Sequence, residues 1–158
     1  MKILACCIAL LIPIAPLRAD DANRASKILT PDLATQILGT EAAGGLRNTY
    51  GDTETGKTWV STASYSSKIG LDPRTVTLLI RHGASAAETQ KAFEQSREVL
   101  KGAAVPGLGA DAFRTETPAQ LDVREGADWL IISAGGLTQP DPALQEKAAR
   151  EILAKLPQ

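Results

Sequence analysis

Four short segments with the patterning of β-strands constrain this 158-residue chain more than any other feature. Residues 57–67 alternate between two sets of side chains, and residues 74–81 form an apolar, β-branched run. Residues 120–124 and 129–133 lie on either side of Glu125-Gly126-Ala127-Asp128, a sequence typical of a hairpin turn. Short strands joined by turns predict an antiparallel sheet, because a doubly wound parallel sheet needs a longer alternation of strands and helices.

Three helices are expected around these strands. Thr30-Pro31-Asp32 provides a cap and a first turn for a helix that ends at Gly39, and residues 42–45 form a flexible link. Ser85-Ala86-Ala87-Glu88 is a capping box, and Pro140-Asp141-Pro142 starts the last helix. The side chains expected on the inner face of the middle helix are Ala92, Phe93, Ser96, Val99 and Leu100. We therefore predict an α+β fold, an antiparallel sheet with helices packed mainly on one face, in which helix-then-strands order indicates two half-repeats.

The first nineteen residues have the pattern of a secretory signal peptide. Lys2 precedes a long apolar run, and Ala19 places a small residue at the expected cleavage point. About fifteen apolar residues are too few to span a bilayer comfortably. A lipoprotein interpretation of Ile3-Leu4-Ala5-Cys6 fails because almost no apolar residues precede it. We expect residues 1–19 to be a signal peptide, residues 20–158 to form a single α+β domain, and the protein to be periplasmic or secreted with no membrane span after cleavage.

Charge and cysteine usage exclude several classes of function. The chain has 17 basic against 18 acidic side chains, so it offers no positive field to a nucleic acid. Its two cysteines, Cys6 and Cys7, would leave with the signal peptide, so the domain would hold no disulfide and no reactive thiolate. One histidine is too few for an ordinary zinc site, and the acidic residues do not follow a calcium-loop pattern. We expect no metal and no cofactor.

Residues 51–58 (GDTETGKT) match the phosphate-binding pattern G-x-x-x-x-G-K-T letter for letter. That loop works only between a buried strand and a helix whose amides surround the phosphates. Residues 46–50 form a poor buried strand, residues 59–65 alternate like a strand, and Asp52 and Glu54 would oppose phosphate charge. A hairpin turn leading into a strand is the better interpretation.

Arg81-His82-Gly83 follows an apolar strand and resembles the signature of the histidine phosphatase family. The resemblance implies that His82 would accept the phosphoryl group while Arg81 grips the phosphate. That family needs a second histidine, and His82 is the only one in this chain. The chain after Gly83 is also too short for the rest of that fold. A histidine entering a glycine turn is the better interpretation, so we assign no catalytic residue and keep a weak hydrolase or phosphatase around His82 as the least favoured alternative.

Trp59 and Tyr65 lie at an even spacing on one face of the same expected strand. If that face is exposed, the two rings form a platform that binds a sugar or a peptide. If it is buried, they belong to the core, which is the commoner role for aromatic residues. Trp59 and Tyr65 are thus the candidate ligand-binding residues of a small-ligand module.

Three segments together resemble a widespread set of small exported bacterial domains. Residues 105–113 match a V-x-G-L-G-D-x-A-F corner with Ala110 inserted, residues 121–133 match the hairpin that follows it, and residues 29–39 match an L-T…L-G opening helix. Those domains are largely uncharacterised and similar in shape to the PsbP-like α+β fold. The resemblance implies that fold and provides no catalytic residue.

The corner also has a structural explanation in its own residues. Gly107 and Gly109 allow positive φ angles, and the Asp111 carboxylate can accept hydrogen bonds from backbone amides. With no catalytic constellation in the chain, we expect a non-catalytic domain that binds a protein or a cell-envelope component through its sheet face or this corner. The alternative is the small-ligand module that uses Trp59 and Tyr65.

Overall fold

The computed structural model describes residues 24–51, 58–67, 73–136 and 138–157, without the side chains of residues 49–51. The expected signal peptide lies outside these residues. Among the helices that the structure describes, none is long and apolar enough to cross a membrane.

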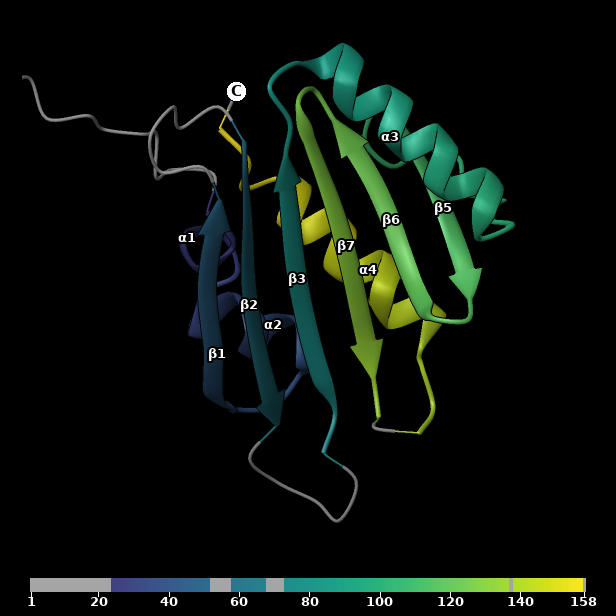
Figure 1. Ribbon diagram of the computed structural model, residues 1–158. Helices are drawn as coiled ribbons and strands as arrows, with labels where there is room; N and C mark the ends of the chain where they lie inside the picture. Colours follow the sequence, from purple (N-terminus) through teal and green to yellow (C-terminus); the bar gives the residue numbers. More distant parts are fainter. Residues whose placement is uncertain (1–23, 52–57, 68–72, 137, 158) are drawn as a thin grey trace, which may run out of the picture.

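The chain adopts the predicted α+β fold, built on a seven-stranded antiparallel sheet in the order β1-β2-β3-β7-β6-β5-β4 (Figure 1). Each strand pairs antiparallel with its neighbour. The elements in chain order are α1 (Ala25–Ile28), α2 (Pro31–Leu38), β1 (Ala42–Gly51), β2 (Trp59–Ser67), β3 (Thr75–His82), α3 (Ala86–Val99), β4 (Ala103–Ala104), β5 (Asp111–Glu116), β6 (Ala119–Glu125), β7 (Asp128–Gly135) and α4 (Pro142–Leu153).

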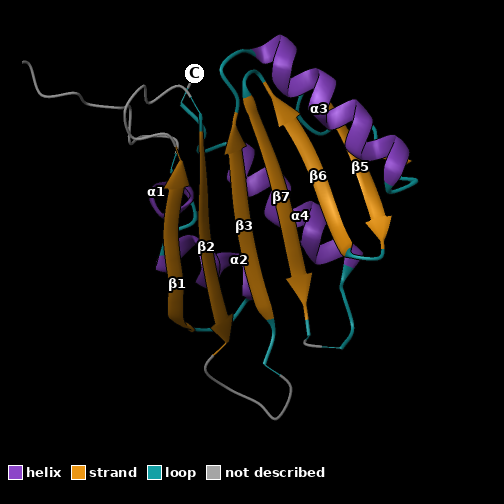
Figure 2. Cartoon of the chain, viewed as in Figure 1, coloured by secondary structure: helices purple, strands orange, loops and turns teal. Residues whose placement is uncertain are grey.

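The helices divide unequally between the two faces of the sheet. Figure 2 shows α1, α2 and α4 behind the sheet and α3 alone in front, over β5 and β6. The alternation along β7 follows this division, since Leu130 and Ile132 join the core under α4 whereas Trp129 and Ile131 pack on the α3 side. The prediction of helices mainly on one face is therefore confirmed.

Local capping explains why the predicted helices begin where they do. Thr30 Oγ1, Ser85 Oγ and Asp141 Oδ1 each accept a hydrogen bond from the amide three residues further on, at 3.2, 3.2 and 2.9 Å. Gly39 ends α2 in the left-handed conformation with a φ of 72°. These ends depend on short-range chemistry, so the sequence alone predicts them.

Strand β1 corrects the prediction of a flexible link. Residues 42–45 are its beginning, and the register shifts between Ala43 and Leu46 where Gly44 takes a φ of 74°. Because β1 is an edge strand, it needs no continuous apolar run, and its Leu46 side chain is 61% exposed. The phosphate-loop pattern begins at Gly51, the last residue of β1, and strand β2 follows it at Trp59. The pattern therefore joins two antiparallel strands, as predicted, and does not lead from a strand into the helix that binds a nucleotide. Residues 52–57 themselves lie outside the described residues.

Two further predictions about the second half were wrong. Residues 111–116 form strand β5, which the sequence alone does not predict; the pattern places residues 111–113 in the corner, and the sequence DAFRTE has no apolar run. Val99 was placed on the inner face of α3, but it is 78% exposed. The helix packs on the sheet through a narrow stripe whose fully covered members are Thr89 and Phe93, so the last turn extends past the sheet surface.

The predicted half-repeats are found in the arrangement of the strands but not in the placement of the helices. The order β1-β2-β3 is mirrored by β5-β6-β7 about the central β3–β7 pair, and each meander follows a helix. However, α2 and α3 lie on opposite faces of the sheet (Figure 1). The two halves therefore pack differently although their strand arrangement is alike.

Candidate functional site

Trp59 and Tyr65, the predicted ligand-binding pair, are buried in the core behind the sheet, with 6% and 2% of their surfaces exposed. Trp59 stacks on the His82 ring, with 5.0 Å between ring centroids and 7° between planes, and the Arg24 guanidinium lies 4.2 Å from the indole. The two rings offer no exposed platform to a sugar, and their surroundings fit the core role that was the other interpretation.

The predicted corner is confirmed in its glycines and corrected in its aspartate. Gly107 and Gly109 have φ angles of 78° and 57°. The Asp111 carboxylate lies 3.9 Å from the Arg97 guanidinium of α3, instead of accepting hydrogen bonds from the corner amides. The corner thus connects β4 to β5, and its aspartate faces α3.

His82 has a carboxylate partner that sequence reasoning did not find. Its Nδ1 lies 2.6 Å from Oδ1 of Asp128, the residue opposite it across the β3–β7 ladder. In catalytic triads such a pair orients the imidazole toward a nucleophile. Among the described residues, no serine, threonine or cysteine side chain hydrogen-bonds to His82.

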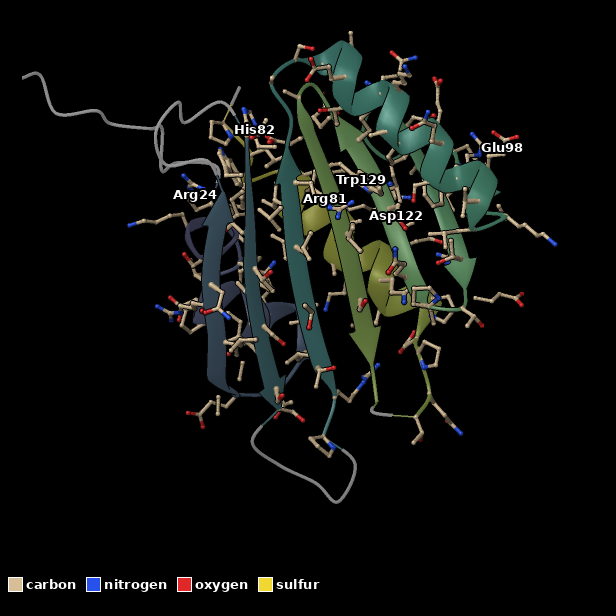
Figure 3. The ribbon with its side chains drawn as sticks, viewed as in Figure 1. Arg24, Arg81, His82, Glu98, Asp122 and Trp129 are labelled. Carbon is tan, nitrogen blue, oxygen red and sulfur yellow. The ribbon has the colours of Figure 1, made fainter. Side chains whose placement is uncertain are left out.

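Arg81, Trp129 and Asp122 form a second cluster on the α3 side of the sheet (Figure 3). Arg81 and Trp129 are opposite each other across β3 and β7, and the guanidinium lies 5.1 Å from the indole centroid. The indole Nε1–H donates a 2.8 Å hydrogen bond to the Asp122 carboxylate, which also accepts one of 2.9 Å from the Gln120 amide. The tryptophan is thus fixed on one side by a buried carboxylate and covered on the other by a cation.

Asp122 is a fully buried carboxyl group. Burial raises its pKa above the ordinary value, although the two hydrogen bonds and the nearby Arg81 charge act in the opposite direction. A buried charge without hydrogen bonds would be costly. The hydrogen bonds from Trp129 and Gln120 therefore stabilise the Asp122 carboxylate in this position.

A small cavity opens beside this cluster, between the start of α3, the end of β3 and the start of β7. Its volume is about 220 Å³. The residues that line it are Arg81, His82, Gly83, Glu88, Thr89, Ala92 and Trp129. The wall is mostly apolar, and Thr89 is held in it by a 2.9 Å hydrogen bond from its hydroxyl to the Ala127 carbonyl.

α3 leaves part of this sheet face uncovered. We call this uncovered part the open face, and it consists of Leu46, Asn48, Val60, Thr62, Ser64, Thr77, Leu79, Ile131 and Ser133. Thr62, Leu79 and Ile131 form one row across three strands, and the next row holds three hydroxyl residues, including Ser64 and Thr77, whose hydroxyl oxygens lie 2.8 Å apart. None of these side chains is charged, and no described helix covers them. The alternation of residues 57–67 was the sequence signal for this surface.

Comparisons with known protein families, with curated proteins and with solved structures found no match. Among the residues that the structure describes, no group of three or more histidine, cysteine or acidic side chains is arranged to hold a metal ion. The arrangement of this chain's own residues therefore carries the functional argument.

Proposed function

We propose that this protein is an exported, non-catalytic binding domain of the cell envelope whose open face docks on a partner protein. The observation that carries the proposal is the unequal covering of the sheet, because α3 contacts β6 and β7 but leaves β2 and β3 bare on its side. A sheet face without a covering layer exposes apolar surface that a partner can bury.

The composition of the open face suits a protein partner. Half-exposed aliphatic side chains such as Leu79 and Ile131 lie among hydroxyl groups that can donate and accept hydrogen bonds. Arg81 adjoins this surface opposite Val60, and one basic side chain provides little attraction for a nucleic acid.

Site-specific photocrosslinking in the periplasm tests the proposal. A photoreactive phenylalanine analogue is introduced at Thr62 or Thr77 in the open face, and at Arg150, an exposed residue of α4, as the matched control. We expect the same crosslinked product from both open-face positions and none from the control. The product should also disappear when Leu79→Asp places a charge between the two positions.

Two results would contradict docking through this face. The first is an equal yield from Arg150, and the second is a crosslink that survives Leu79→Asp in a variant that still unfolds cooperatively. Export is tested separately, since mass spectrometry of the periplasmic protein should find Asp20 as the first residue.

A weak hydrolase at His82 is the second candidate, and the His82–Asp128 contact of 2.6 Å is the observation that favours it. If His82 is a general base, His82→Ala should abolish hydrolysis of a panel of ester and phosphoester substrates while Asp128→Asn should reduce it strongly. Equal background rates in the unmodified protein and in His82→Ala would eliminate this candidate.

A further inference from the structure

Arg81 stands out in the described part of the chain because its guanidinium packs on an indole and has no hydrogen-bonding partner there. Its guanidinium lies over Trp129 at 5.1 Å, and it makes no hydrogen bond or ion pair with another described residue. Stacking on an indole leaves the edge of the guanidinium, with its paired N–H donors, free to bind a planar anion.

The support beneath Arg81 is unusually rigid for a surface site. Trp129 is 5% exposed and donates its indole hydrogen to Asp122, which Gln120 holds in turn. On the α3 side, the ring lies edge-on to Phe93, with 5.8 Å between centroids. A guanidinium over such a ring loses less freedom on binding than an arginine on a mobile support.

The cavity beside Arg81 limits the size and polarity of the group that a bound anion can carry. Its volume of about 220 Å³ lies below the roughly 300–1,000 Å³ typical of pockets for drug-sized molecules, so it accepts a group the size of one side chain. Ala92 and the indole of Trp129 make its wall apolar, and Glu88 lies at the same cavity as the one acidic residue. The negative charges of Glu88 and of the nearby Asp122 disfavour a doubly charged phosphate more than a singly charged carboxylate.

We propose that Arg81 and the adjoining cavity form a binding site for a carboxylate that carries a neighbouring aliphatic group, such as the C-terminal residue of a peptide with an apolar side chain. The carboxylate accepts two hydrogen bonds from the Arg81 guanidinium, and the aliphatic group enters the cavity against Ala92 and Trp129. The site adjoins the open face, since Arg81 pairs with Val60, but its test requires no partner.

The test is a titration of the purified ¹⁵N-labelled protein followed by NMR. The indole signal of Trp129 reports on the site, while the backbone amide signal of Ala148, buried in the core behind the sheet, is an internal control. The probes are N-acetyl-leucine and N-acetyl-leucinamide, which share the aliphatic group and differ in the carboxylate. We expect saturable shifts of the Trp129 signal with N-acetyl-leucine and an affinity at least about tenfold weaker for the amide, as befits loss of a charged hydrogen bond.

Variants identify the group that binds. Arg81→Gln should lower the affinity for N-acetyl-leucine by about tenfold or more. Arg150→Gln removes an equal charge from an exposed position in α4 and should leave this affinity unchanged. Equal affinity for the two probes would overturn the carboxylate assignment. Unchanged binding by Arg81→Gln, or no shift of the Trp129 signal with N-acetyl-leucine, would overturn the site.

Discussion

The two faces of the sheet are built from the same strands but differ in what they bury. Behind the sheet, three helices enclose a continuous core in which Leu130 and Ile132 are fully buried. In front, one helix encloses a small aromatic cluster of Phe93, Phe113 and Trp129, and the rest of that face is open. Along a central strand such as β7, every second side chain therefore packs in the rear core, and the side chains between them lie on the front face.

This difference teaches where the chain can vary its function without losing its fold. The rear core contains most of the apolar area that is removed from water, so it accounts for most of the hydrophobic stabilisation. The front face holds the groups with unusual chemistry, namely buried Asp122, stacked Arg81 and the hydroxyl rows. Polar groups of this kind add little to stability, which is consistent with the recognition role that we propose for this face.

Truncating a leucine on each face should produce the largest contrast. Leu130→Ala removes a fully buried side chain from the central strand β7, and we expect it to lower the free energy of unfolding by about 4 kcal/mol. Leu79→Ala makes the same chemical change on the open face, where the side chain is only partly buried. It should lower the free energy of unfolding by no more than about 1.5 kcal/mol. Urea denaturation measures both values, and equal losses would show that the two faces contribute alike.

Crowding the aromatic cluster should have an intermediate effect. A Cβ at Gly102 would lie 2.3 Å from Cδ2 of Phe113, which is fully buried and packs on Phe93 at 4.8 Å between centroids. We therefore expect Gly102→Ala to cost about 2 kcal/mol, a typical penalty for overpacking, measured by urea denaturation.

A double-mutant cycle shows whether the ring is responsible for that penalty. In a Phe113→Leu background, the smaller side chain leaves room for the new methyl group, so Gly102→Ala should cost less there. Additive losses would mean that the strain lies in the backbone after α3 and not in the cluster.

The buried carboxyl of the front face should give the protein a specific pH dependence. Because burial raises the pKa of Asp122 above its ordinary value of 3.8, the folded state binds this proton more tightly than the unfolded state. The contribution of Asp122 to the free energy of unfolding is then greatest below pH 3.8, falls as pH rises through the raised pKa, and stays constant above it.

Asp122→Asn removes this component of the pH profile. An asparagine oxygen can still accept the hydrogen bond from Trp129, so at neutral pH we expect a stability equal to or up to about 1 kcal/mol above that of the unmodified chain. Asp32→Asn, at an exposed carboxyl in the first turn of α2, controls for the loss of one negative charge. A variant profile that keeps the same fall with pH would assign it to another group.

The parts of the fold that the sequence predicted are those determined by local chemistry. Caps such as Thr30 and Ser85 and the alternation of β2 appear within a few residues, so pattern alone locates them. Strand β5 has no local signature, because its place is set by pairing with β6 after the corner. Edge strand β1 carries glycines and an exposed Leu46, a composition that a strand with one free side tolerates.

The candidate site was less predictable because it depends on register between distant strands. Arg81 meets Trp129, and His82 meets Asp128, only because β3 and β7 pair at the centre of the sheet. No spacing within either strand encodes this pairing. Conversely, Trp59 and Tyr65 were recognised as a pair on one face, but whether a helix covers that face depends on where α1 and α2 pack.

The smallest effect is expected at the centre of the open face. Thr77→Val replaces a hydroxyl by a methyl of similar size, and it removes the 2.8 Å contact with the Ser64 hydroxyl. The lost hydrogen bond and the higher strand propensity of valine oppose each other, so the free energy of unfolding should change by less than about 0.5 kcal/mol. If the face serves recognition, the same substitution should still reduce the crosslinked product formed from Thr62, its neighbour on β2. A loss of stability near that of Leu130→Ala, with crosslinking unchanged, would instead make the open face part of the structural core and remove the distinction between the two faces.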